Sequence, residues 1–270
     1  MRFFTLISSS VLIVAGLAKH SVAQDVTVPP SSLFELAVGD RLEDSGVFTV
    51  AIGASARTEA FEIVRRVDGG RVVTSITTRT AAGVSTFPAE GRWTYDANER
   101  AVSAVGKTRY GDTPAYIEIV AAPPIVRITV EAGAVKRTIP APCDPDCLID
   151  FSPSALPMFT MTRQYDTDRG GIQTFNMVGQ GLFSDSPLLG SSLQIEVLER
   201  DTITTPEGGD LDVLQYVVAP DLSMRPVRGF EFNLWVDADH RPLAFDMPVE
   251  TRGIRDGFAF VVDALPPAFD

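Results

Sequence analysis

The sequence predicts an all-β protein with minor helix: a large, strongly twisted antiparallel sheet or half-barrel around one central short helix. Apolar and polar residues alternate with the period of a half-buried strand in at least six segments, and only one stretch has helical character. Turns rich in Gly, Asp and Asn separate these segments. A doubly covered parallel sheet is disfavoured, because its strands would be apolar on both faces.

The clearest unit is a β-hairpin over residues 230–250. Phe232 and Leu234 point to one face of its first strand, and Phe245 and Met247 resume the alternation after a turn-rich segment. An isolated hairpin is only marginally stable in water. These four side chains must therefore pack against the rest of an antiparallel sheet.

The first residues predict export to the periplasm. Arg2 is followed by an apolar run at 3–17 and then by a cleavage region of small residues before Asp25. This is the pattern of a signal peptide over residues 1–24. The run is shorter than the ~20 residues that a membrane-spanning helix needs. The cleavage region contains no cysteine, so a lipid anchor is not predicted. Residues 25–33 are expected to form a flexible lead-in. No later segment is apolar enough to cross a bilayer.

The composition is acidic and disfavours nucleic acid as a partner. The 270 residues carry a formal net charge of −12, and removal of two basic residues with the signal peptide gives −14. A phosphate backbone requires a basic patch. Arg65-Arg66 and Lys136-Arg137 are isolated pairs on predicted strands.

The two cysteines are Cys143 and Cys147. In an oxidising compartment they are expected to form a structural disulfide that closes a tight loop and directs the chain into the following segment. A redox pair would normally have two intervening residues, and a metal site would need more ligands than Asp144 and Asp146 supply.

Beyond the hairpin, the elements follow from alternation and turn signals. Strands are predicted at 47–52, 60–67, 71–80, 91–96, 101–105, 116–121, 125–131, 135–139, 172–178, 193–201, 211–218 and 253–262. A long loop is expected at 179–192. The expected organisation is one β-rich domain at 34–262, or two lobes that meet near 141–167, followed by a tail at 263–270.

One segment, 154–164, is predicted to be helical, with Ser152 as its N-cap and Pro153 at its first position. Its apolar side chains are Met158, Phe159 and Met161. They either pack onto the sheet as core or contribute an adaptable apolar binding surface.

Few chemistries fit the mature chain. His240 would be its single histidine, and a solvated turn histidine is the ordinary interpretation. No nucleophile elbow, P-loop or dinucleotide motif is present. A carboxylate pair of glycosidase type stays open, and 166–171 is better interpreted as a turn than as a calcium loop. No catalytic residue, metal site or cofactor is predicted, and enzymatic activity is left undecided.

Five short motifs resemble those of an uncharacterised group of bacterial exported β-rich domains of unknown function. They are SALP at 154–157, RQYD at 163–166, RGGIQT at 169–174, LWVD at 234–237 and RGIRDG at 252–257. Such domains occur alone or ahead of an α/β-hydrolase domain. The resemblance implies a long twisted antiparallel sheet, broadly like the half-barrels of lipoprotein carriers, and a periplasmic setting. It implies no catalytic residues.

These observations favour a non-catalytic periplasmic binding or carrier module for an apolar or amphipathic envelope molecule such as a lipid. The residues predicted to contact the ligand are Met158, Phe159, Met161, Phe232, Leu234, Phe245 and Met247. The alternatives are an envelope interaction or assembly protein that uses strand edges and the 179–192 loop, and a hydrolase or hydrolase accessory domain with an unrecognised site.

Overall fold

The computed structural model describes residues 36–264, except 53–54, 82–83, 111–112, 152–153, 181–186, 220–230 and 248–250. All of these residues belong to one compact unit, Ser31–Asp270. The predicted signal peptide at 1–24 and lead-in at 25–33 lie outside the described residues, as does most of the predicted tail. No helix within the described part is long and apolar enough to cross a bilayer.

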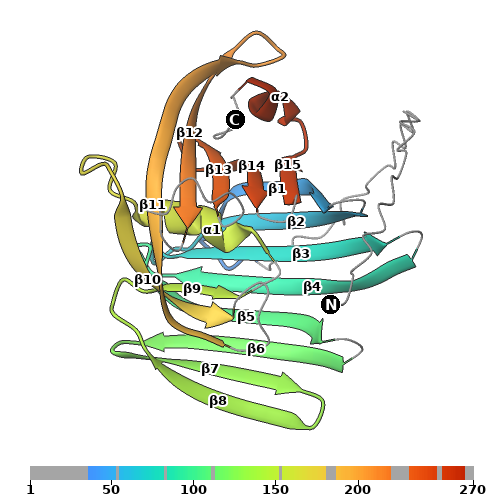
Figure 1. The fold of residues 1–270 in the computed structure, drawn as a ribbon, viewed down its shortest axis with the longest axis vertical. Helices are drawn as coiled ribbons and strands as arrows, with labels where there is room; N and C mark the ends of the chain where they lie inside the picture. The colour runs from blue at the N-terminus through green and yellow to red at the C-terminus, as the bar shows by residue number, and fades with distance from the viewer. Residues whose placement is uncertain are drawn as a thin grey trace, which may run out of the picture. The chain divides into compact units, whose positions relative to one another are not determined.

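The predicted antiparallel architecture is confirmed as a single open sheet of fifteen strands (Figure 1). The first eight strands are β1 (Arg41–Ile52), β2 (Ser55–Arg65), β3 (Arg71–Ala81), β4 (Val84–Tyr95), β5 (Ala101–Tyr110), β6 (Thr113–Ala122), β7 (Ile125–Ala132) and β8 (Val135–Pro142). The others are β9 (Leu148–Phe151), β10 (Gln173–Gln180), β11 (Pro187–Thr204), β12 (Asp210–Ala219), β13 (Phe232–Asp237), β14 (Pro242–Met247) and β15 (Thr251–Arg255). The helices are α1 (Leu156–Met161), the 3₁₀ turn η1 (Thr162–Gln164) and α2 (Ala259–Ala264).

The strand order joins two meanders through the first and last strands. The chain runs from β1 outward to β8, crosses back to the opposite edge at β9, and returns strand by strand to β15, which pairs with β1. The crossover lies between the end of β8 at Pro142 and the start of β9 at Leu148, so this short segment connects the two halves of the sheet. All neighbouring pairs are antiparallel except β9–β10, which is parallel because β9 enters from the crossover.

The sheet curves around α1. Strand β9 lies against β5, and β8 comes close to β11, so the two edges of the sheet approach each other. Helix α1 contacts β3 from the first half and β9 and β13 from the second (Figure 1). The prediction of a central short helix is therefore confirmed.

The helix begins later than its predicted start. Ala155 is the N-cap, and α1 with η1 covers Leu156–Gln164. The predicted caps Ser152 and Pro153 lie outside the described residues. Instead, the Ser154 hydroxyl oxygen accepts a hydrogen bond from the Leu156 N–H at 3.1 Å. Pro157, which lacks an N–H, sits in the first turn, where that donor has no partner within the helix.

The concave face carries the main apolar cluster. Alternation places Val126 and Ile128 of β7 inward, whereas Arg127 is exposed, as the pattern of this strand predicts. The same alternation in β2 buries Phe61 and Ile63. Both cysteines lie in this cluster, and the predicted Cys143–Cys147 disulfide is present.

The hairpin is apolar on both faces, which the alternation alone did not predict. Leu234 faces the main cluster, but Trp235 is only 2% exposed and packs in a second cluster on the opposite face. That cluster also contains Leu243 of β14 and Val261 of α2. In an antiparallel sheet, a strand with alternating apolar and polar residues commonly leaves one face exposed to solvent. Here α2 covers that face.

Two predicted segments differ from the structure. The last strand was predicted at 253–262, but β15 ends at Arg255, Gly257 turns with φ +86°, and α2 follows. The Val261 side chain must reach the second cluster, and a helix places it there. The 179–192 loop is shorter than predicted because β10 extends to Gln180 and β11 starts at Pro187; residues 181–186 lie outside the described part.

Candidate functional site

The seven predicted ligand-contacting side chains come together on the concave face. Met158, Phe159, Met161, Leu234, Phe245 and Met247 belong to the main apolar cluster, and Phe232 packs against it partly buried. The Phe159 ring lies 5.8 Å from the Phe48 ring and 6.1 Å from the Phe245 ring, between centroids. Of the six cluster members, Met247 is the most exposed, at 9%. The sequence therefore identified a real cluster.

Polar contacts hold α1 against the sheet. The Ser154 hydroxyl donates to the carboxylate of Glu59 on β2, whose side chain is fully buried. The Thr160 hydroxyl contacts the Tyr95 hydroxyl of β4. Because both contacts join α1 or its entry to the first half of the sheet, they set the position of Met158 and Phe159 inside the curve.

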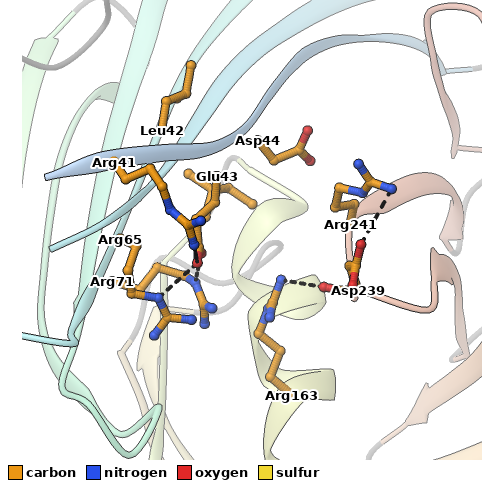
Figure 2. A pocket seen from close by; sticks show the side chains of 10 residues that line it. Arg41, Leu42, Glu43, Asp44, Arg65, Arg71, Arg163, Asp239 and Arg241 are labelled. Carbon is orange, nitrogen blue, oxygen red and sulfur yellow. Dashed lines mark hydrogen bonds and ion pairs between the residues drawn. The ribbon is translucent and has the colours of Figure 1, made fainter.

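A polar pocket of about 400 Å³ opens at the end of η1 (Figure 2). Five arginines and three acids line it, together with two apolar residues, and we call it the arginine pocket. Its lining residues are Arg41, Leu42, Glu43, Asp44, Ile63, Arg65, Arg71, Arg163, Asp239 and Arg241. Ile63 also belongs to the main apolar cluster, so the pocket adjoins that cluster.

A β-bulge in β1 directs Glu43 toward the arginines. Leu42 pairs with Val64 and Asp44 with Ile63, which leaves Glu43 as the extra residue. Its two carboxylate oxygens accept bonds from Arg65 Nε and Arg71 Nε, both at 2.9 Å. Burial raises the pKa of Glu43, but the hydrogen bonds and charges of both arginines outweigh it and lower that pKa.

A second acid that binds Arg65 and Arg71 comes from the β4–β5 turn. Glu99 adopts a positive φ of 61°, and its carboxylate binds Arg65 and Arg71. Its backbone carbonyl accepts a hydrogen bond from Gln164 Nε2 at 2.9 Å. The turn therefore ties η1 to the arginine pocket.

Arg163 has a different environment from the other lining arginines. Its Nη2 donates to the backbone carbonyls of Asp239 and His240, each at 3.1 Å. No carboxylate within the described residues lies in ion-pair distance of its guanidinium. Burial and the charge of Arg71 lower the pKa of Arg163. Figure 2 shows its guanidinium between the Glu43, Arg65 and Arg71 side chains and the Asp239–Arg241 turn.

His240 is not the solvated turn residue that the sequence predicted. It has a positive φ of 58°, which directs its carbonyl toward Arg163, and its ring lies 5.9 Å from the Tyr216 ring. The side chain is half-buried, and burial, with the charge of Arg163, lowers the pKa of His240. Burial also raises the pKa of Tyr216 to about 12. Both side chains are therefore neutral at pH 7.

The arginine pocket was missed by the sequence interpretation, which treated Arg65 as part of an isolated basic pair. Its residues come from β1, β2, β3, η1 and the β13–β14 turn, and only the β1–β15 seam and the crossover bring them together. The bulge that presents Glu43 lies ahead of the predicted strand 47–52, so the alternation pattern gave no signal for it. Among the described residues, no group of three or more His, Cys, Asp or Glu side chains is placed to hold a metal ion.

No protein-family model matches the sequence. No curated protein matches it either. Among solved structures, the chain is similar to the crystal structure of a beta-barrel-like protein of domain of unknown function DUF1849 from Brucella abortus. The TM-score is 0.49 at 8% sequence identity, and the match covers 78% of this chain and 94% of that chain.

Proposed function

We propose that the protein is a periplasmic, non-catalytic binding module that takes up an apolar or amphipathic envelope molecule within the curve of its sheet. The observation that carries this proposal is the methionine content of the apolar cluster around α1. Met158, Met161, Met177 and Met247 all belong to it. Unbranched thioether side chains change rotamer at low cost and adapt to varied apolar partners.

The arrangement around the cluster also favours binding. The sheet is open, and among the seven predicted ligand-contacting side chains Phe232 and Met247 are the two nearest to solvent. An acyl chain that displaced these two side chains would enter the cluster that contains Phe159 and Phe245. The Cys143–Cys147 disulfide fits an oxidising compartment such as the periplasm.

The direct test is native mass spectrometry, with organic extraction, of protein purified from the periplasm of its own host. We expect a mass increment that disappears on extraction and a recovered amphiphile. Protein that carries no increment, and that does not bind dodecanoate or phospholipid in solution, would refute the proposal.

Fluorescence gives a second, residue-specific test. The chain has two tryptophans: Trp93 lies in the main cluster, and Trp235 lies in the second cluster under α2. In the Trp235→Phe variant, Trp93 alone reports on the concave face. We expect saturable changes of its emission on titration with dodecanoate. The Trp93→Phe variant, which reports on the opposite face, is expected to show little change.

A matched pair of substitutions tests whether the ligand enters the apolar cluster beside Phe232. Phe232→Glu places a charge beside the cluster and is expected to weaken dodecanoate binding at least tenfold, since an isolated charge in an apolar site costs several kcal/mol. Val102→Glu introduces the same charge at an apolar side chain that is already 40% exposed. Equal affinities of the two variants would contradict uptake beside Phe232.

A further inference from the structure

We propose that the arginine pocket binds an oxyanion, a carboxylate or a phosphate group, with Arg163 as its principal donor. This inference rests on the proposed binding function, because the anion would be the polar end of the bound molecule. It names a second contact region, at the end of η1, for that ligand.

The first argument is the hydrogen-bond capacity of Arg163. A guanidinium has five N–H donors. Within the described residues, Nη2 is the single atom of Arg163 that donates, to two carbonyls of the β13–β14 turn. Its Nε and Nη1 have no protein acceptor there, and neither atom is fully buried. These donors are therefore open to the pocket.

The second argument is that the nearby acids already have partners. Glu43 is shared by Arg65 and Arg71. Asp44 binds Arg255 through both carboxylate oxygens, at 2.6 and 2.9 Å. The Asp239 side chain is 79% exposed and lies 3.6 Å from Arg241. Arg163 is thus left without a counter-ion in a partly desolvated position, where a bound anion would supply the missing charge.

The third argument is rigidity. The Arg163 guanidinium is held by the Asp239 and His240 carbonyls, while the neighbouring Gln164 is tied to the Glu99 carbonyl. Hydrogen bonds to two different hairpin turns therefore hold η1 in place. A donor that is positioned before binding loses little conformational entropy when the ligand arrives.

The fourth argument concerns the molecule that fits. The pocket adjoins the apolar cluster through Ile63, and η1 directly continues α1, so a headgroup at Arg163 and an acyl chain beside Met161 would belong to one ligand. An amphiphile with an oxyanion head matches both regions. A free oxyanion matches the arginine pocket alone.

The test compares wild type, Arg163→Gln and the control Arg127→Gln, which changes an exposed arginine on β7. Glutamine keeps an amide NH2 group, with two N–H donors, and removes the charge. Isothermal titration calorimetry is carried out with dodecanoate and with dodecyl maltoside, which share a chain length and differ in head charge. Inorganic phosphate and acetate test free anions. Phosphatidylglycerol and phosphatidylcholine vesicles test lipid headgroups.

We expect wild type and Arg127→Gln to bind dodecanoate at least about tenfold more tightly than Arg163→Gln does, the usual effect of a charged hydrogen bond. Dodecyl maltoside affinity is expected to be unchanged in all three proteins. Binding of phosphate or acetate that depends on Arg163 would identify a free-anion site, and a preference for phosphatidylglycerol that Arg163→Gln abolishes would identify a lipid headgroup.

Equal dodecanoate affinity of wild type and Arg163→Gln would overturn the inference and leave the binding function standing. If wild type binds phosphate but binds none of the amphiphiles, the proposed function is overturned and the anion site stands. If Arg163→Gln does not fold, the ¹⁵Nε resonance of Arg163 in wild type gives the same decision. Its saturable shift with phosphate or dodecanoate supports the site, and an unchanged resonance refutes it.

Discussion

Asp44 and Arg255, 211 residues apart, form a bidentate ion pair across the seam between β1 and β15. The Arg255 Nη1 and Nη2 atoms lie 2.9 and 2.6 Å from the two Asp44 oxygens, and both side chains are largely buried. The guanidinium also lies over the rings of Phe61 and Phe258. The two halves of the chain are therefore joined by a side-chain contact beside the backbone ladder.

Removing one member of this pair is expected to be costly. The Asp44→Ala variant leaves a buried guanidinium without its carboxylate, which typically lowers the free energy of unfolding by about 3–5 kcal/mol. The control is Glu90→Ala, which breaks the exposed Lys107–Glu90 pair and is expected to cost less than about 1 kcal/mol. Urea denaturation measures both. Similar losses would show that the seam does not depend on Asp44.

Glu59 gives a pH prediction. Burial raises the pKa of this fully buried carboxyl group, and its hydrogen bond with Ser154 only partly offsets the shift. The folded state therefore retains a proton that the unfolded state releases near its ordinary value of 4.5. The stabilising effect is complete below that pH and is lost as pH rises through the folded-state pKa.

The Glu59→Gln variant removes this ionisation and keeps an acceptor for Ser154. We expect it to be more stable than wild type at pH 8, with the difference shrinking toward pH 4, in chemical denaturation at several pH values. Glu207→Gln, in an exposed turn, serves as the control. A stability difference that is independent of pH would contradict the buried-acid interpretation.

Gly253 is predicted to be intolerant of any side chain. It pairs with Phe245 across β14 and β15, and an added Cβ would overlap the Phe245 ring. Overpacking of this kind usually costs about 1–3 kcal/mol. We therefore expect Gly253→Ala to lower the melting temperature. Gly209→Ala, where an added Cβ would make an ordinary contact with Thr205, is expected to leave it nearly unchanged.

The disulfide is expected to act locally. Its loop of a few residues implies a chain-entropy contribution of about 2 kcal/mol. Both cysteines are buried, so Cys143→Ala/Cys147→Ala avoids burying new hydroxyl groups. We expect this variant to lose no more than that amount in denaturation and to retain dodecanoate binding. Intact mass with and without reductant checks the bond, and a fully unfolded variant would show a wider role.

The sequence predicted the elements whose signal is local. Alternation identified β7 and the β13–β14 hairpin, because a period of two is a property of neighbouring residues. Apolar character likewise placed Phe159 and Phe245 in one cluster, since both must leave water. The disulfide was predicted from the expected oxidising compartment, and the structure contains it.

Long-range pairing decided the rest. Local alternation gives no information on which strand lies beside which, so the β1–β15 seam and its Asp44–Arg255 pair required the folded chain. Long-range packing also decided the outer face of the hairpin: residues 259–264, predicted to belong to the final strand and the tail, form α2, whose Val261 packs in one cluster with the buried Trp235. Arg163 shows the reason most clearly: its open donors depend on carbonyls 76 and 77 residues away, and no pattern within η1 encodes that distance.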